Sequence, residues 1–422
     1  MAIFMIFLMI ILMILGVPVV YSIMLATILF FITEPSVSIE VFIQRFISGT
    51  QSFPLLAIPF FVLTGYLMNI SDISRRLIDL SSAVFGHIKG GIGYINIMVN
   101  TFMAGMSGSS NADAAVLSKI LVEPMSKKGY SRGLATGITA AASLIAPIIP
   151  PSIALIMYGF MAQVSIGKLF MAGIIPGILM AVLLFVFNFS IARKYDLPKE
   201  HEHFSAKKVF STFIAAILAL FTPIIIVGGI RFGIMTPTEA GAITVVYAFC
   251  IGLFVYKKIN FKGFKEVLRE SIILTAIVMI IVAASSAFGW VLTWEQIPQQ
   301  IAMTVLNITD NPILVLLIIN ILLIIIGMFI EGTASIVLLT PLLIPLITQV
   351  GVDPIHFGII MAMNLAIGSI TPPLGTVMFT TSAAANVSIV EFLKRSWGLY
   401  VVLIIALLIV TYVPSLSLFL AK

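Results

Sequence analysis

Charged residues are scarce in this chain of 422 residues. Asp, Glu, Lys and Arg together make up 9% of it, whereas 60% is hydrophobic and the mean hydropathy is +1.19. A soluble globular domain carries about a quarter charged residues. The composition therefore excludes that class and predicts an integral membrane protein.

Cysteine and histidine are also rare. The only cysteine, Cys250, has no partner for an intramolecular disulfide or a metal site, so we expect it to be a small packing residue. No His-Glu-x-x-His motif and no intramembrane Ser/His pair occurs, because the histidines fall in loops or near span ends: His87, His201, His203 and His356. We therefore expect no enzyme.

The hydrophobic segments are long enough to cross a bilayer. Residues 168–191, 209–229 and 396–420 each exceed the roughly 20 apolar residues that one transmembrane helix needs. The first 15 residues lack the basic region of a secretory signal, so they are predicted to form a retained first helix. The net charge of +6 comes from basic residues in loops between spans, which is typical of membrane topology. We expect a lipid bilayer around the chain and no nucleic-acid partner.

A repeat relates the two halves of the chain. Five pairs of turn, break or cap residues are 222 positions apart: Gly105/Gly327, Gly129/Gly351, Ser131/Asp353, Pro150/Pro372 and Pro151/Pro373. Gly/Pro interruptions at corresponding places in two hydrophobic halves point to a transport site at the bilayer midplane. The sequence therefore predicts a secondary transporter built from two repeats, residues 1–195 and 205–422.

Each half contains one hydrophobic segment that is too long for a single span. Residues 91–128 and 312–350 would each form a helix of more than about 50 Å, so each is predicted to be a re-entrant helical hairpin that turns at its centre. Residues 131–163 and 353–385 are predicted to be helices broken at their prolines. Each half then crosses the membrane five times. Because five is odd, the two halves of this all-α fold must be inverted relative to each other.

Loop charges support this topology. With ten crossings and two hairpins, eighteen of the 23 Lys and Arg residues fall on one side, four fall on the other, and Lys119 lies inside the first hairpin. Cytoplasmic loops are enriched in Lys and Arg. We therefore predict that both termini lie outside the cytoplasm, that the first hairpin opens inward and that the second opens outward.

Four amphipathic stretches are expected to lie in the membrane interface: residues 36–48, 72–87, 260–270 and 295–307. Residues 72–87 and 295–307 directly precede the two hairpins. Two interpretations remain open: they are ordinary linkers, or they are arms that hold a mobile unit made of hairpin and broken helix.

Polar residues gather at the tip of the first hairpin, residues 105–113. Polar groups at membrane depth are costly unless partnered, which favours a functional site, although small residues also allow close helix packing. The facing residues 146–152 contain three prolines, which break a helix and expose carbonyl oxygens and half-helix ends. Carbonyls and hydroxyls suit Na⁺, and helix N-termini suit an anionic substrate.

The second half supplies an equivalent set at residues 327–333 and 368–376. Its tip contains one acidic residue, Glu331. Glu331 and Asp113 each have three possible roles: a cation ligand, a proton carrier, or a structural group bonded to unwound backbone.

At these residues the chain resembles the large permease (M) subunit of a tripartite ATP-independent periplasmic (TRAP) transporter, over essentially its whole length. The motifs that carry the resemblance are residues 107–114 (SGSSNADA), 150–152 (PPS), 236–240 (TPTEA) and 371–375 (TPPLG).

The resemblance implies Na⁺-coupled uptake of a carboxylate-bearing solute across the bacterial inner membrane by an elevator motion. It also implies two partners, a periplasmic substrate-binding protein (P) and a separate small four-helix membrane subunit (Q). Substrates in the family include C4-dicarboxylates, sialic acid and other organic acids. The alternative is a stand-alone Na⁺/carboxylate symporter that needs no binding protein, and a channel is disfavoured because spans such as residues 313–326 are uniformly apolar.

We predict a Na⁺ site where each hairpin tip meets its broken helix, and a substrate carboxylate bound between them. The predicted ion-binding residues are Ser107, Ser109, Asn111 and the carbonyls near Pro147 and Pro150 in the first half, and Gly332, Thr333, Thr371 and Gly375 in the second. The predicted substrate-binding residues are Ser109, Ser110, Asn111, Pro151, Ser152, Glu331, Thr333 and Thr376.

Overall fold

The computed structural model describes residues 2–201 and 203–421, and within those ranges the regular structure is helical, with no strand. Eight of the described helices are long and apolar enough to cross a membrane, by length and composition. The predicted all-α membrane class is confirmed.

The first part of the chain forms α1 (Ala2–Ile14), α2 (Val19–Thr33), α3 (Ile39–Ser48), the 3-10 turn η1 (Phe53–Leu56), α4 (Ala57–Ile70), α5 (Ile73–Phe85), α6 (Gly91–Ser107), α7 (Ser110–Lys127), α8 (Arg132–Ser143), α9 (Ile153–Ala162) and α10 (Ile166–Lys194). Serine side chains accept a hydrogen bond from the first turn of several of these helices, at Ser38, Ser109, Ser131, Ser152 and Ser165. Such caps fix where a helix begins, because they satisfy amides that have no partner inside the helix.

The second part forms α11 (Ala206–Arg231), α12 (Pro237–Cys250), the π-helical turn η2 (Ile251–Val255), α13 (Phe261–Trp294), α14 (Ile297–Leu306), α15 (Pro312–Phe329), α16 (Gly332–Gln349), α17 (Pro354–Gly368), α18 (Thr376–Ala385), α19 (Ile389–Tyr412) and α20 (Ser415–Leu418). Helix α12 begins with a capping box, in which Thr236 and Glu239 each accept from the other's backbone N–H.

Helix interruptions occur at all four places where the sequence predicts them. Helices α6 and α7 meet at Gly108, α8 and α9 are separated by residues 144–152, and α15 and α16 meet at Ile330 and Glu331. Helices α17 and α18 are separated by residues 369–375. The division of the chain into two repeats and their inversion stay predictions.

Two spans differ from their expected bounds by more than a few residues. The amphipathic stretch at residues 260–270 and the span at 271–292 are one continuous helix, α13, of 34 residues. Asn260 caps its start by accepting from the Gly263 N–H at 2.7 Å, and no proline interrupts the residues that follow. The last span begins at Ile389, because Ser388 caps it, and it ends before Pro414 rather than continuing to residue 420.

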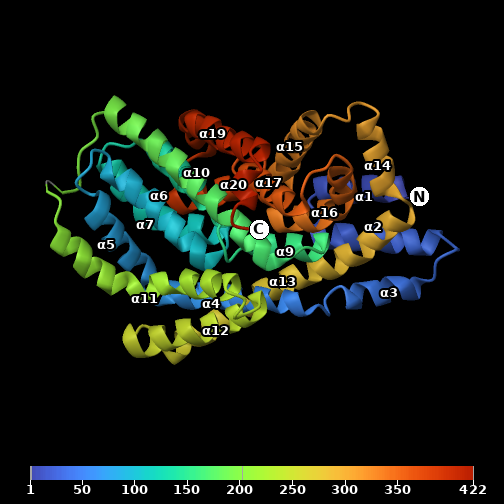
Figure 1. Cartoon of the computed structure of the whole chain (residues 1–422), viewed down its shortest axis with the longest axis horizontal. Helices are drawn as coiled ribbons and strands as arrows, with labels where there is room; N and C mark the ends of the chain where they lie inside the picture. Colours follow the sequence, from blue (N-terminus) through green and yellow to red (C-terminus); the bar gives the residue numbers. More distant parts are fainter. Residues whose placement is uncertain (1, 202, 422) are drawn as a thin grey trace.

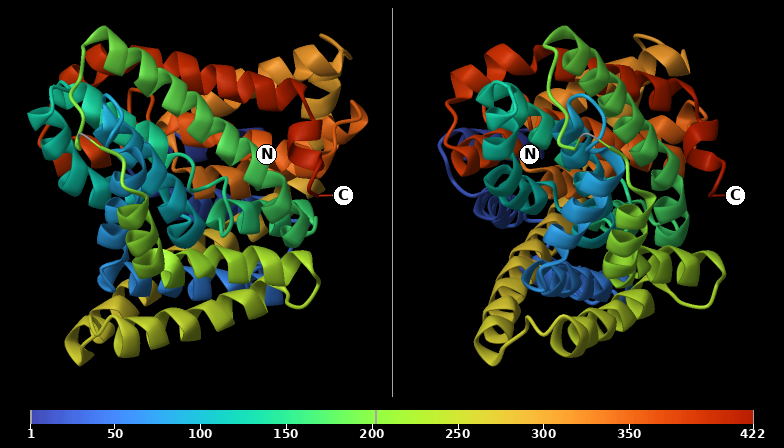
Figure 2. Two further views of the ribbon diagram at one scale, coloured as in Figure 1. Left: turned by 60° about the vertical axis from the view of Figure 1, so that its left-hand side comes forward. Right: turned by 90° about the vertical axis from the view of Figure 1, so that its left-hand side faces the viewer.

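The helices form two groups on opposite sides of the molecule. Helices α4, α11 and α12 lie together along the lower side in Figures 1 and 2, and α13 packs against α4. Helices α10, α15 and α19 lie along the upper side. The hairpins and broken helices pack on each other across the halves, α7 against α18 and α16 against α9. The four interruptions therefore meet in the interior.

Each hairpin is joined to its own broken helix by a buried amide cluster. In the first half, Asn96 on α6 donates to Thr139 on α8 at 2.7 Å, and Asn100 donates to Asn96 at 2.8 Å. In the second half, Asn364 on α17 donates to Asn320 on α15, also at 2.8 Å. Because polar side chains without partners are costly in a low-dielectric interior, these bonds fix the register of each hairpin on its broken helix.

Two glycines permit a backbone contact between α15 and α17. A Cβ atom on Gly368 of α17 would lie 2.6 Å from the Cα atom of Gly327 on α15. Small residues let helices approach to backbone contact in a membrane protein. This contact lies directly beside the second hairpin tip, so it sets where that tip sits.

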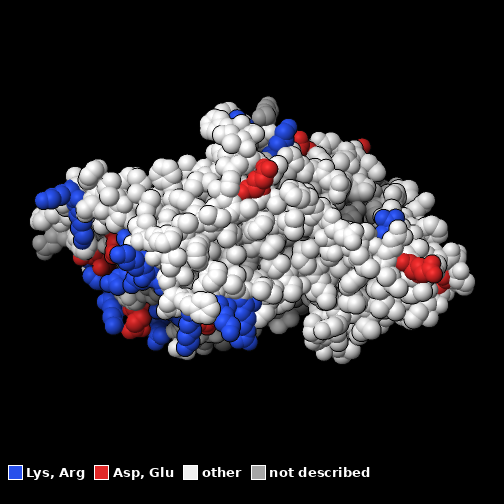
Figure 3. Space-filling view, turned by 90° about the horizontal axis from the view of Figure 1, so that it is seen from below, with Lys and Arg blue, Asp and Glu red and all other residues white. Residues whose placement is uncertain are grey.

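Basic side chains gather toward one end of the molecule. Figure 3 shows Lys and Arg concentrated at the left, the end at which α5 lies in Figure 1. There Lys258 lies 3.4 Å from the Asp72 carboxylate, and the Arg76 guanidinium lies 4.0 Å from the centre of the Tyr256 ring. This clustering agrees with the asymmetry of the loop charges, and the assignment of that end to the cytoplasm stays a prediction.

Cysteine labelling tests this orientation. In a Cys250→Ser background, we expect Asp310→Cys to react with a membrane-impermeant maleimide in intact cells and Lys199→Cys to react only after permeabilisation, because both side chains are exposed at opposite predicted faces. Labelling of Lys199→Cys in intact cells would reverse the predicted orientation.

The glycine contact is tested by adding one methyl group. We expect Gly368→Ala to lower the free energy of unfolding by about 1–3 kcal/mol, because the new Cβ meets backbone that cannot move aside. The matched control is Gly228→Ala in α11, where a Cβ would meet nothing within 4 Å, so stability should be unchanged or raised. The measurement is the thermal midpoint of the purified protein, and equal midpoints for the two variants would contradict the expectation.

Candidate functional site

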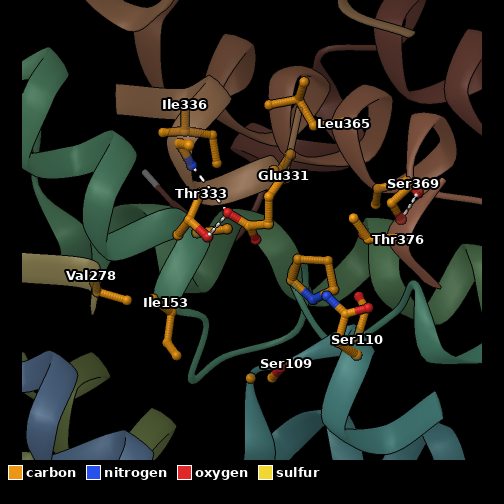
Figure 4. A pocket seen from close by; sticks show the side chains of 18 of the residues that line it. Ser109, Ser110, Ile153, Val278, Glu331, Thr333, Ile336, Leu365, Ser369 and Thr376 are labelled. Carbon is orange, nitrogen blue, oxygen red and sulfur yellow. Dashed lines mark hydrogen bonds between the residues drawn. The ribbon is translucent and has the colours of Figure 1, made fainter. Parts of the chain in front are cut away.

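A cavity of about 370 Å³ lies where the four helix interruptions meet. Its polar lining comes from both hairpin tips and from the second break, with Ser109, Ser110, Asn111, Glu331, Thr333, Ser369 and Thr376. Apolar side chains of α13 form one wall, including Leu274, Ile277, Val278 and Ile281. Figure 4 shows these parts of the chain facing one another across the cavity. The volume is within the range of small-molecule binding sites.

The first hairpin tip is a tight turn at Gly108. This residue has φ +60°, and a Cβ atom there would lie 2.5 Å from the Pro151 carbonyl oxygen. Only glycine meets both requirements without strain. The tip is therefore seated directly on the first broken helix.

A buried carboxylate lies behind the first tip. Asp113 is 1% exposed, and the Ser107 hydroxyl donates to its Oδ2 atom at 2.8 Å. Its Oδ1 atom is buried and has no hydrogen-bond partner among the described residues. A buried carboxylate oxygen without a partner is costly, so this position is incomplete without a ligand, a water molecule or a proton.

The first break is held by its own side chains. Ser152 is fully buried, donates to the Pro147 carbonyl at 2.6 Å and accepts from the Leu155 N–H at 3.1 Å. It therefore caps α9 and bridges the break. The Pro150–Pro151 bond is cis, as is Pro372–Pro373 at the corresponding place in the second half.

The second hairpin tip is capped by a carboxylate. The Oε2 atom of Glu331 accepts from the Thr333 hydroxyl at 2.5 Å and from the Ala334 N–H at 3.2 Å. Glu331 is the N-cap of α16 and is exposed to the cavity, as Figure 4 shows. A structural role at this tip is thus present, and the carboxylate remains accessible to a ligand.

The second break is closed by backbone bonds. The Ser369 carbonyl accepts from the N–H groups of Val377 and Met378 at 2.9 and 3.2 Å, and the Thr371 hydroxyl donates to the Ile367 carbonyl at 2.7 Å. A Cβ atom on Gly375 would lie 2.7 Å from the Ser369 carbonyl oxygen, so glycine is needed for this turn.

The structure brings most of the predicted site residues to the cavity, but not all. Those that line it are Ser109, Ser110, Asn111, Pro147, Glu331, Gly332, Thr333 and Thr376. Those that lie outside its lining are Ser107, Pro150, Pro151, Ser152, Thr371 and Gly375. Of these, Ser107 donates a hydrogen bond to Asp113, and Ser152 caps α9. Their roles as ion or substrate ligands stay predictions.

Sequence reasoning missed three contributions to the cavity. The first is the α13 wall, whose residues look like any other lipid-facing or core span. The second is the Ser369 side chain, which lies within the expected set at residues 368–376 but was not among the predicted ligands; the repeat places it at an offset of 222 from Pro147. The third is contact between halves, such as that between the Thr380 hydroxyl and the Asn111 side-chain oxygen, which lie 3.4 Å apart.

The chain matches one family over nearly its whole length. Residues 6–416 match the family described as "Tripartite ATP-independent periplasmic transporter, DctM component".

Individual relatives agree with that match. The chain is 40% identical over 410 residues to the sialic acid TRAP transporter large permease protein SiaM of Vibrio cholerae, covering 96% of this chain and 95% of that protein. It is 39% identical over 369 residues to the C4-dicarboxylate TRAP transporter large permease protein DctM of Pseudomonas aeruginosa, covering 87% and 86%. It is also 39% identical over 406 residues to the isethionate TRAP transporter permease protein DctMQ of Oleidesulfovibrio alaskensis, covering 96% of this chain and 64% of that protein.

Solved structures share the fold at low sequence identity. The YdaH transporter of Alcanivorax borkumensis has a TM-score of 0.60 and 13% identity, with 87% of this chain and 86% of that chain covered. MtrF of Neisseria gonorrhoeae has a TM-score of 0.52 and 12% identity, with 87% and 82% covered. The fold, the paired helix interruptions and the relatives agree, and the chain belongs to the family of DctM components, the large permeases of TRAP transporters.

Proposed function

We propose that this protein is the inner-membrane permease of a Na⁺-coupled TRAP transporter that takes up an organic acid. The observation that carries the proposal is the cavity where two hairpin tips and two broken helices meet. Helix N-termini and hydroxyls line it, and these groups suit a carboxylate. The relatives named for sialic acid and C4-dicarboxylate transport support an organic acid as substrate.

The first cation site is proposed at the Ser107–Asp113 pair. A hard cation such as Na⁺ prefers oxygen ligands, and this pair offers a hydroxyl and a carboxylate oxygen that lacks a partner. Carbonyl oxygens exposed by the break at Pro147 and Pro150 are candidates for the remaining ligands. A second site is proposed around Gly332, Thr333, Thr371 and Gly375, where the equivalent elements of the second half meet.

Transport of Na⁺ and substrate is coupled if each cation supplies the interactions that a hairpin tip lacks. A cation bound behind a tip stabilises the arrangement that the substrate also needs, so each ligand raises the affinity for the other. In the proposed elevator motion, the hairpins and broken helices move as one unit against the group of α4, α11, α12 and α13. The amide clusters within each half support such a unit, and α5 and α14, which precede the hairpins, are proposed as its arms.

Two partners are proposed from the family. A periplasmic binding protein delivers the substrate, and a small membrane subunit accompanies the permease. The relative DctMQ, of which this chain spans 64%, is consistent with a further segment that acts together with this one.

Reconstitution tests the coupling ion and the delivery step together. With the binding protein and small subunit present in proteoliposomes, we expect uptake in a Na⁺ gradient and loss of uptake when choline replaces Na⁺. Omitting the binding protein should abolish uptake as well. Undiminished uptake in choline would refute the ion assignment, whereas uptake without the binding protein would favour a stand-alone symporter.

The buried carboxylate is tested by removing its charge. We expect Asp113→Asn to raise the Na⁺ concentration for half-maximal uptake by about tenfold or more, because a charged ligand contributes about 1.5–3 kcal/mol. The matched control is Asp79→Asn on α5, an exposed residue that should leave Na⁺ activation unchanged. Equal Na⁺ activation in both variants would remove Asp113 from the proposed site.

A further inference from the structure

The cavity lining contains an acidic side chain but no basic one. Among the described residues that line it, Glu331 is the one with an ionisable side chain, and no Lys, Arg or His faces it. A permease for organic acids therefore has a binding cavity whose single formal charge is negative. Since like charges in a partly desolvated site repel strongly, this carboxylate limits which acids fit and how they lie.

The two hairpin tips differ at the same structural position. Ser109 caps α7 and Glu331 caps α16, and they are 222 positions apart. The first cap is neutral, so the positive end of the α7 dipole remains available to an anion. The second cap is a carboxylate, which already occupies the positive end of α16.

The two tips also differ in the hydrogen-bonding groups that they present to the cavity. At the first tip, Asn111 lines the cavity, and its side-chain amide can donate through its NH₂ group. The Ser110 hydroxyl lines the cavity beside it. At the second tip, the Thr333 hydroxyl is used by Glu331 Oε2, and the Oε1 atom remains as an acceptor. The first tip offers donors and the second offers an acceptor, and Figure 4 shows Glu331 and Ser110 on opposite sides of the cavity.

We propose that Glu331 is a specificity-determining residue that selects acids with one carboxylate and a tail rich in hydrogen-bond donors. The substrate carboxylate lies against Ser110, Asn111 and the N-terminus of α7, and hydroxyl or N–H groups of the tail donate to Glu331. A dicarboxylate places its second charge against Glu331 and is rejected. This inference rests on the proposed function, because it assumes that the cavity binds an organic acid.

Binding of defined probes to the purified permease tests the inference. The probes are sialic acid and gluconate, which carry one carboxylate and several hydroxyls, and succinate, which carries two carboxylates. Affinities are measured by calorimetry in Na⁺, with the small subunit present. We expect the unmodified protein to bind at least one hydroxylated acid about tenfold or more tightly than succinate.

Three variants separate charge from helix capping. Glu331→Ser copies the cap found at Ser109, so it keeps the helix start and removes the charge; it should shrink the preference over succinate by about tenfold or more. Glu331→Asp keeps both the cap and the charge and should retain the preference. Glu40→Gln removes an exposed carboxylate on α3, away from the cavity lining, and should change nothing.

The outcomes distinguish a failure of the Glu331 role from a failure of the proposed organic-acid transport. If succinate binds the unmodified protein as tightly as the hydroxylated acids, or if Glu331→Ser keeps the full preference, the role of Glu331 is refuted while the proposed function stands. If none of the three acids binds to the unmodified protein or to Glu331→Ser, the organic-acid cavity itself is refuted.

Discussion

The backbone of a membrane protein must satisfy its own hydrogen bonds, and this constraint governs the whole structure. Lipid offers no partner for a free N–H or C=O group, so a helix can be interrupted only where other protein groups or an aqueous cavity replace the lost bonds. Here four interruptions converge, and each is closed locally: Ser152 bridges the first break, and the Ser369 carbonyl accepts two amides across the second. The groups left over at the helix ends line a single cavity. The site is thus a consequence of where the helices stop.

Close contact and polar clusters fix the positions of those ends. Gly108 lies against the Pro151 carbonyl and Gly368 lies against Gly327, so each hairpin touches its own broken helix at the level of the backbone. Farther from the tips, the Asn96–Thr139 and Asn364–Asn320 bonds hold the same pairs of helices together. Contacts between α7 and α18 and between α16 and α9 then join the two halves around the cavity. These contacts link both tips and both breaks around the cavity.

Local signals explain what the sequence could predict. The paired prolines at an offset of 222 located the two breaks, since a proline acts on its own stretch of backbone, and the excess length of two hydrophobic segments predicted the two hairpin turns. The continuity of α13 through residue 270 was missed because the charge-rich residues 260–270 carry no stop signal after Asn260, and charge alone does not end a helix. The lining was predicted only where polar residues mark it. The α13 wall and the Asn111–Thr380 contact depend on packing between distant segments, which periodicity does not encode.

The two acidic residues at the tips differ in burial. Asp113 is buried, whereas Glu331 is exposed to the cavity. Asp113 has Ser335 at its repeat position, and Glu331 has Ser109 at its own, so each half carries one acid and one serine in exchanged places. Asp113 is 1% exposed and held by Ser107, an environment that a carboxylate tolerates when a cation or a proton compensates it. Glu331 faces an open cavity and caps a helix, where its carboxylate accepts from the Ala334 N–H and the Thr333 hydroxyl. The two carboxylates therefore lie in different surroundings, Asp113 buried behind the first tip and Glu331 open to the cavity at the second.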